Sequence, residues 1–541
     1  MRRARAGRPA LRARSGWSWP CAPGSAPAPA GARPAPFRAV AALLAASALA
    51  ACAARPGSDP APAGPLHDGP VVLITVGSLR ADAVGAFAPP ADRPGGFPGG
   101  DPTPALDRLV AEADWAGPAV APSSFPPLSL ATLATGLGPW DHGVTEVLRS
   151  ALRPELRTLA EAFAERGYRG AFYRSGHWIR PQAGWAQGFA AVHDLGGGRR
   201  AAGHLAALGE GDGRQLLWIH LPGAGAPYLR RDWLLPRVGE VPPELAASLP
   251  ERVEPWELER WADPAEPLPP GPRRVIETLY MLAVAHADDQ LGELVAALRR
   301  SGRWDDTLLV VTSPSGVELG ERGGTGTSGG LGRELLEVPL VVKLPRAWRE
   351  KLPQGAGEVP PRGLAPGPRP SLDRVWATLV GAVGGETPPA AGPSLLRGSG
   401  RGALSEIYVA NGANAVSLVE GDLQLVWTRR HAPAEPDYWR ARLTTYRDPA
   451  AHRLLPPPAE PAPRIFGRLA AAFAETPPLS GGGADARVLS LVRWTEGGGT
   501  EPVDDPALAA AMAERLYRRW AAWQPCEAPP GPRPEAPARR R

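Results

Sequence analysis

Serine hydroxyls that could do chemistry follow two predicted strands and precede one predicted helix. Ser78 and Ser315 each follow an apolar run that is typical of a buried strand. Ser124 lies two residues before a helical segment that starts near Pro126, where the positive end of the helix dipole would favour a developing anion. A serine hydroxyl is a weak nucleophile until a base or a metal ion activates it. The sequence around these serines shows neither, so the serines alone do not predict an enzyme.

Charged and imidazole side chains near these serines have simple structural explanations. Arg80 and Asp82 fit the start of a helix with a local ion pair. Glu318 and Glu321 follow the second apolar run, and two isolated glutamates are expected on the surface. His142 is expected to be a packed, hydrogen-bonded histidine. A metal site is therefore not predicted from these residues.

Apolar runs alternate with amphipathic segments through the middle of the chain. The predicted buried strands are 71–76, 216–221, 307–312 and 338–344. The longest predicted helix, 275–300, carries Asp288 and Asp289 as a solvated edge or a buried anchor. This alternation predicts an α/β fold with a mostly parallel sheet sandwiched by helices. Short antiparallel strands at 415–427 and 441–446 predict a small C-terminal α+β subdomain.

The first residues have the pattern of an export signal. Eight arginines and no acidic residue precede a short apolar stretch at 39–51, which is too short to span a bilayer. Leu49-Ala50-Ala51-Cys52 resembles a bacterial lipobox, in which the cysteine becomes the lipidated first residue. We therefore expect an exported protein that is anchored by lipid at Cys52 in a bacterial cell envelope.

Cleavage before Cys52 would also change the charge of the chain. The formal net charge of +5 contains the eight leader arginines, so the mature chain would be negative and nucleic-acid binding is not expected. Only Cys52 and Cys526 would remain, which excludes an internal disulfide if Cys52 carries lipid. The predicted parts are a lipoprotein signal peptide (1–51), a flexible tether (52–68), an α/β domain (69–385), a C-terminal subdomain with a terminal helix (386–525) and a disordered tail (526–541).

Several segments, in consistent order over about residues 69 to 475, resemble the sulfatase family of the alkaline-phosphatase-like superfamily. They include VVLITVGSLRADAVGAF, TPALDRLVAEADWAGPAVAPSSFPPLSLATLATGLGPWDHGV and HADDQLGELVAALRRSGRWDDTLLVVTSPSG. The resemblance implies the family's α/β sandwich. It also implies hydrolysis of sulfate esters by a formylglycine made from Cys or Ser, with a calcium ion held by carboxylates.

The residues at the family's functional positions differ from that chemistry. Two calcium ligands are expected after the first strand, where this chain has Gly77 and Ser78, and two more after the strand at 307–312, where it has Pro314 and Ser315. Calcium takes six to eight oxygen ligands, several of them charged, and these four side chains supply no carboxylate. The position of the nucleophile holds Pro126.

Other family positions have changed as well. The cation expected four residues after the nucleophile is Leu130, and the usual Asp-Pro-His before Ala-Pro-Tyr is Gly223-Ala224-Gly225. A segment that is commonly rich in Gly and His reads GGTGTSGGLG at 323–332. His177 resembles part of the family's Gly-Lys-Trp only after a shift of one residue. These changes together predict lost or redirected activity.

The first hypothesis is an envelope lipoprotein that has lost sulfate-ester hydrolysis and serves a binding or scaffolding role. Its partner would be an anionic glycan or an envelope protein. No metal cofactor is expected, and calcium would bind only if distant carboxylates such as Asp263 or Glu406 rebuild a site. The alternative is an active sulfuric ester hydrolase (a sulfatase) in which Ser124 is the formylglycine precursor or the nucleophile, although Leu128 replaces the arginine of the maturation motif. A third possibility is a phosphoryl-transfer relative using zinc, which needs Asp and His at the same changed positions.

Overall fold

The computed structural model describes the folded body of the chain from His67 onward. The described residues are 67–142, 144, 152, 154–176, 179, 184–210, 213–261, 267–327, 330–349, 369–387, 394–395, 403–407, 414–429, 487–495, 499–505, 507–509, 511–513 and 515–516. The predicted signal peptide, Cys52, His177, Asp263, the predicted strand at 441–446 and the predicted tail lie outside these residues.

The central sheet has seven strands in the order β2-β11-β8-β1-β5-β3-β4. Its strands are β1 (Val71–Val76), β2 (Trp115–Val120), β3 (Arg169–Arg174), β4 (Ala191–Asp194), β5 (Gln215–Leu221), β8 (Leu308–Thr312) and β11 (Glu337–Lys343). Strand β1 pairs in parallel with β5 and β8, whereas β11 is antiparallel to β8 and to β2. The predicted α/β fold with a mostly parallel sheet is confirmed.

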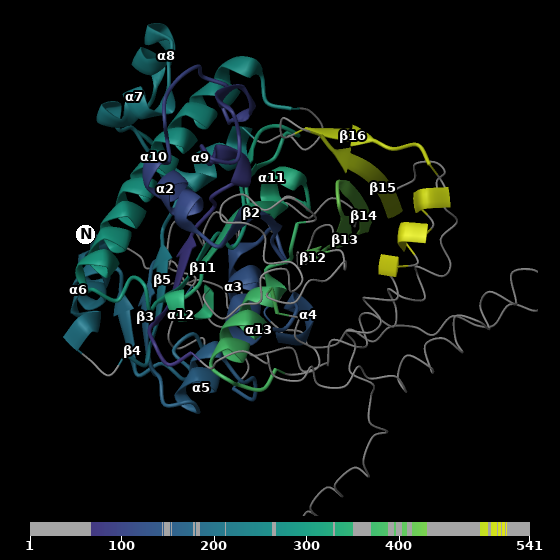
Figure 1. Ribbon diagram of the computed structural model, residues 1–541. Coiled ribbons are helices and arrows are strands. Elements are labelled where there is room, and N and C mark those ends of the chain that lie inside the picture. The colour runs from purple at the N-terminus through teal and green to yellow at the C-terminus, as the bar shows by residue number, and fades with distance from the viewer. Residues whose placement is uncertain are drawn as a thin grey trace, which may run out of the picture. The chain divides into compact units, whose positions relative to one another are not determined.

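Strand β1 explains why helices cover both faces of the sheet. All six of its residues are buried, and successive side chains of a strand point to opposite faces. Val72 and Ile74 pack with α2 (Pro104–Glu112), α6 (Arg199–Ala206) and α10 (Pro270–Arg300). Val71 and Leu73 pack with α3 (Pro126–Thr135), α5 (Leu159–Ala164) and α13 (Asp373–Ala382). Figure 1 shows these two groups of helices on either side of the sheet.

Short helices and short strands connect the strands and helices of the α/β body. The helical ones are η1 (Ala81–Ala83), η2 (Pro90–Asp92), α4 (Pro139–His142), η4 (Gly196–Gly198), η5 (Ala207–Glu210), η6 (Asp232–Leu234), α7 (Leu235–Val238), α8 (Pro243–Ser248), α9 (Pro255–Trp261), α11 (Arg333–Leu336) and α12 (Arg346–Arg349). The strands are β6 (Tyr228–Leu229) with β7 (Arg252–Val253), and β9 (Glu318–Leu319) with β10 (Thr325–Gly326). Within the described residues, none of the helices combines the length and apolar character that a transmembrane span requires.

A second sheet follows the α/β body and confirms the predicted antiparallel strands around residues 415–427. It has the order β12-β13-β14-β15-β16, and neighbouring strands are antiparallel. Its strands are β12 (Ala403–Ile407), β13 (Asn414–Glu420), β14 (Leu423–Arg429), β15 (Arg487–Trp494) and β16 (Thr500–Pro502). Glu406 lies on β12, and its side chain is not described.

Candidate functional site

Three loops leave the same edge of the sheet, because β1, β5 and β8 are parallel neighbours. In an open α/β sheet, ligands bind beyond the carboxyl ends of the strands, so this edge is the candidate site. Gly77 and Ser78 lie on the β1-exit loop (77–82), and Pro314 and Ser315 on the β8-exit loop (313–321). The structure therefore brings the four expected ligand positions to one edge.

The β1-exit loop and the β5-exit loop (222–227) contact each other backbone to backbone at Gly77. The Gly77 carbonyl accepts a hydrogen bond from the Ala224 amide (2.8 Å), and the Gly77 amide donates to the Leu221 carbonyl (3.2 Å). A Cβ placed on Gly77 would lie 2.7 Å from the Pro222 carbonyl oxygen, and a Cβ on Gly223 would lie 2.0 Å from the Gly77 carbonyl oxygen. The packed loops thus leave no room for an aspartate side chain at Gly77.

Ser78 is held in an unusual backbone conformation. Its φ is +56°, a region that few non-glycine residues adopt, and the residue is only 7% exposed. The Tyr280 hydroxyl on α10 donates to the Ser78 carbonyl (3.1 Å) and accepts from the Arg80 amide (3.0 Å). A Cβ on Gly225 would lie 2.9 Å from the Ser78 hydroxyl oxygen, so the β5-exit loop covers this side chain closely.

The serines of the β8-exit loop are fully buried and bonded to the backbone. The Ser315 hydroxyl donates to the Gly316 carbonyl (3.1 Å), and the Ser313 hydroxyl donates to the Ser315 carbonyl (2.7 Å) and accepts from the Leu79 amide (3.0 Å). Together with Gly77 and Pro314, these groups offer no carboxylate, so they do not fit a calcium ion. Across the described ranges, no group of three or more His, Cys, Asp and Glu side chains is arranged to hold a metal.

The start of α3, where the family resemblance expects the nucleophile, is an apolar and tightly braced segment. Pro126 is the first residue of the helix. The Ser129 hydroxyl donates to the Ser123 carbonyl (2.9 Å) and accepts from the Ser123 amide (3.1 Å). Ser124 is fully buried, and its hydroxyl has no hydrogen-bond partner. Among the described residues, no base is hydrogen-bonded to the Ser124 hydroxyl.

His142 is the packed histidine that the sequence predicts. Its Nδ1 accepts a hydrogen bond from the Val144 amide (3.1 Å), so the proton sits on Nε2, which lies 3.1 Å from the Leu128 carbonyl oxygen. The ring is fully buried. His142 therefore holds α4 against α3 and is not available as a ligand.

A second histidine, His220 near the end of β5, was not singled out from the sequence. Its Nδ1 lies 2.8 Å from the Thr75 hydroxyl of β1, and the same hydroxyl accepts a hydrogen bond from the Trp218 indole (3.0 Å). Burial lowers the pKa of His220 to about 4, so the ring is neutral at physiological pH. The register of β1 and β5, which the sequence does not reveal, creates this pair.

Of the two glutamates expected on the surface, Glu318 is buried and Glu321 is partly buried. Glu318 is 5% exposed, and the Glu321 side chain is 20% exposed. Burial raises the pKa of Glu318, whose nearest cation is Arg322 at 3.9 Å. Arg80 forms the expected ion pair with Asp82, and it also pairs with Glu321. The prediction that these glutamates lie on the surface was wrong. The sequence does not show that Glu321 pairs with Arg80, because the two residues are 241 positions apart.

Asp288 is a buried anchor, which is one of the two roles that the sequence predicts for it. Its two oxygens accept hydrogen bonds from the Ala105 (3.0 Å) and Leu106 (2.8 Å) amides at the start of α2. Burial raises its pKa to about 6, against the effect of these amides and of Arg237 at 2.9 Å. Asp289 is half-exposed and pairs with the same arginine. Neither residue faces the candidate site.

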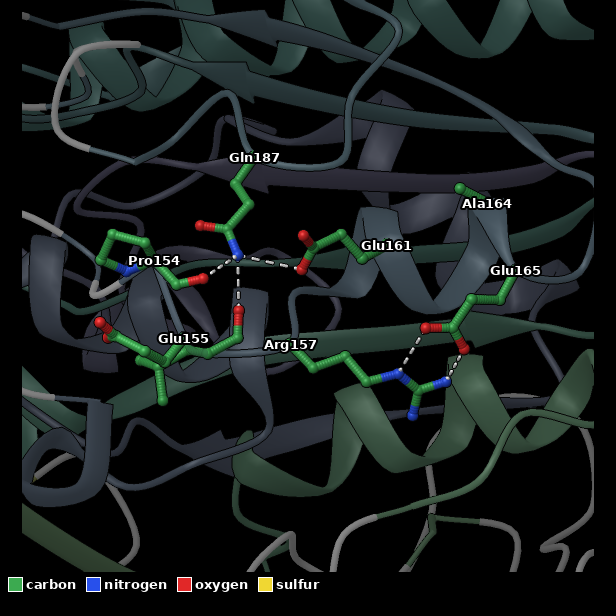
Figure 2. Close-up of a pocket in the computed structure, with 8 residues that line it drawn as sticks. Pro154, Glu155, Arg157, Glu161, Ala164, Glu165 and Gln187 are labelled. Atoms are coloured by element: carbon green, nitrogen blue, oxygen red, sulfur yellow. Dashed lines mark hydrogen bonds and ion pairs between the residues drawn. The ribbon is translucent and has the colours of Figure 1, made fainter.

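A separate hollow of about 550 Å³ lies beside α5. Figure 2 shows how its polar groups bind one another: Arg157 pairs with Glu165, and Gln187 donates to Glu161. The Gln187 amide also donates to the Pro154 and Leu156 carbonyls (3.1 and 2.6 Å). Because these groups are already satisfied, the hollow does not show a prepared ligand site.

Comparison with known proteins finds a similarity in the central segment of the chain. Residues 208–361 match the family model described as Sulfatase. This segment of the chain is similar to the sulfatase family. The matched segment contains β5, α10, β8 and β11, and it includes the β5-exit and β8-exit loops. It does not include Gly77 or Ser124.

The chain is also similar to a curated protein, the multifunctional alkaline phosphatase superfamily protein PehA of Trinickia caryophylli. The two are 35% identical over 127 residues, which are 23% of this chain and 22% of PehA, so the chain spans about a fifth of that relative's length. Similar solved structures include a phosphonate monoester hydrolase of Agrobacterium radiobacter (18% identity, TM-score 0.49, covering 71% of this chain and 96% of that one). A sulfatase-like protein of Bacteroides thetaiotaomicron gives 15% identity and a TM-score of 0.49, covering 73% and 96%.

Proposed function

We propose that this sulfatase-like protein is a lipid-anchored component of a bacterial cell envelope that does not hydrolyse sulfate esters and serves a binding or scaffolding role. The closed packing around Gly77 supports the proposal. A metal ligand at this position would need a side chain, and its first atom would already lie 2.7 Å from the Pro222 carbonyl oxygen. At Gly77 the backbone of the β5-exit loop therefore occupies the space that a ligand side chain would need.

The envelope location rests on the signal pattern before Cys52, and the partner would be an anionic glycan or an envelope protein. Loss of hydrolysis is tested by assaying the purified protein against aryl sulfates, sulfated sugars and phosphate esters, with and without calcium. We expect rates equal to those of buffer alone. Turnover that co-purifies with the protein and disappears on mutation of a residue of the edge would overturn the proposal.

The orphan hydroxyl of Ser124 favours a second candidate, an active sulfatase with a displaced site. A fully buried hydroxyl without a partner is uncommon and is a feature of some functional sites. Ser124 would then be the formylglycine precursor or the nucleophile. Mass spectrometry of the peptide that contains Ser124 would detect the oxidised residue, and Ser124→Ala would abolish any turnover. An unmodified serine, together with full activity of Ser124→Ala, would eliminate this candidate.

A further inference from the structure

The turn that follows β6 carries the more exposed of two tryptophans on the described surface. Trp233 lies on η6 and is 72% exposed, whereas Trp261 at the end of α9 is partly covered. Figure 1 shows α7, which follows η6 directly, beside α10, and α10 packs against both elements. An exposed tryptophan by itself is ordinary on a protein surface, so its neighbours decide whether it has a role.

Arg231, the residue before η6, is a half-buried cation that forms no ion pair among the described residues. Its guanidinium donates to the Leu229 carbonyl (3.2 Å), and burial lowers its pKa with no acidic group opposing the effect. One titratable neighbour on α10 is His286, whose pKa is lowered by burial and then by the charge of Arg231, so the imidazole stays neutral. The other three arginines of residues 228–254 are paired: Arg230 with Asp232, Arg237 with Asp288, and Arg252 with Glu254. A partly buried charge is stabilised by a counter-charge, so Arg231 has the environment of a cation that binds an anion from solution.

Hydrogen bonds on both sides of this turn hold its backbone in place. Before the turn, β6 pairs with β7, and the Arg230 guanidinium donates to the Leu249 carbonyl (3.0 Å). Within the turn, the amide of the buried Leu234 donates to the Arg231 carbonyl (2.9 Å). Arg231 and Trp233 are therefore two residues apart on a braced turn, and a ligand would not have to order the backbone that carries them.

We propose that Arg231 and Trp233 form a binding site for an anionic oligosaccharide, on the segment that follows the β5-exit loop. The face of an indole ring is apolar and weakly negative, so it attracts the C–H groups of a sugar ring that stacks on it. The guanidinium presents a planar row of donors that matches a sulfate or carboxylate group. A neutral sugar would make only the first contact, and a small inorganic anion only the second.

The test measures the binding of two tetrasaccharides by titration calorimetry. A chondroitin sulfate tetrasaccharide carries carboxylates and sulfates, and cellotetraose is a neutral sugar of the same length. We expect the wild-type protein to bind the charged tetrasaccharide about tenfold more tightly than the neutral one, because only the charged sugar bonds to the guanidinium. This binding should weaken as the salt concentration is raised.

Two substitutions remove the two contacts separately. Arg231→Gln should weaken binding of the charged tetrasaccharide by about tenfold and reduce its salt dependence, because a charge-assisted hydrogen bond is lost. Trp233→Ala should weaken binding by about the same factor, and Trp233→Phe should recover part of the loss because it keeps an aromatic face. Neither side chain is fully buried, so each variant should keep the Tm of the wild type to within about 2 °C. The matched controls are Arg252→Gln, which removes an arginine paired with Glu254, and Trp261→Ala; both should bind like the wild type.

Three results would overturn the inference. They are no measurable binding of the charged tetrasaccharide, equal affinity of the wild type for both tetrasaccharides, and unchanged affinity in Arg231→Gln or Trp233→Ala. Binding of phosphatidylglycerol vesicles that depends on Trp233, without binding of the tetrasaccharide, would make the turn a membrane contact instead. The inference goes beyond the proposed function, because the turn would bind the sugar whether or not the strand edge hydrolyses esters. Ester hydrolysis would overturn the proposed function alone and leave the oligosaccharide site standing.

Discussion

At the scale of single residues, Gly77 shows why a missing ligand cannot simply be restored. The exchange Gly77→Asp would place the family's expected residue at its expected position. We predict that it lowers the free energy of unfolding by about 2–4 kcal/mol, because its Cβ would meet the Pro222 carbonyl oxygen at 2.7 Å. Urea denaturation with and without calcium measures this. Gly77→Ala should be destabilising too, since it introduces the same clash without a carboxylate.

Gly203 on α6 provides the control for Gly77. A Cβ there has nothing within 4 Å, so Gly203→Ala should be neutral or slightly stabilising. If calcium stabilised Gly77→Asp but not Gly77→Ala, the loops would have opened to form a metal site, and the packing argument would fail. Equal destabilisation of both variants, with no calcium response, is the expected result.

At the scale of elements, helix α2 depends on a cap supplied from a distant part of the chain. The side chain of its N-cap residue Thr103 accepts no hydrogen bond from the first turn of the helix. The amides of Ala105 and Leu106 donate instead to the Asp288 carboxylate on α10. We predict that Asp288→Ala lowers the free energy of unfolding by about 2–4 kcal/mol, because it leaves these amides without an acceptor. Asp289→Ala, which removes a half-exposed partner of the same Arg237, should cost below about 1 kcal/mol in urea denaturation. Equal losses would argue against the cap.

The same elements show what the sequence can predict. The apolar runs of β1, β5 and β8 and the long amphipathic α10 predict the sheet and its covering helices, because burial on one or two faces leaves a periodic pattern. The exit loops carry no such pattern. Glu321 is expected on the surface from the sequence because its partner Arg80 lies 241 residues away. The hydroxyl of Tyr280, from the middle of α10, accepts a hydrogen bond from the Arg80 amide, and the sequence does not show this contact either. The glycine packing at Gly77 likewise depends on strand register, which periodicity does not give.

At the scale of the whole molecule, the second sheet is attached to the α/β body through a buried tryptophan. The Trp494 ring on β15 has the guanidinium carbons of Arg333 and Arg369 at 5.4 and 5.1 Å from its centroid, and both arginines pair with Glu337 at the start of β11. Its indole donates to Gln424 (2.9 Å), and Gln424 donates to the Leu331 carbonyl (2.6 Å). This contact fixes the sheet beside residues 331–337, which contain α11 and the start of β11.

We predict that Trp494→Ala detaches the second sheet from the body without unfolding the body. The ring is 3% exposed, so its removal costs about 3–5 kcal/mol of packing at this contact. Gln424 and the two arginines lose their contacts with the indole, although the arginines keep Glu337 and Gln424 keeps the Leu331 carbonyl. Hydrogen exchange should become faster in β14, β15 and residues 331–336, while β1, β5 and β8 keep their protection, since the contact touches none of them. The matched control is Trp233→Ala, because Trp233 is 72% exposed and should change exchange nowhere in the second sheet. Faster exchange throughout the central sheet of Trp494→Ala would mean that the two sheets unfold as one unit, and the second sheet would then be part of the core rather than attached to it.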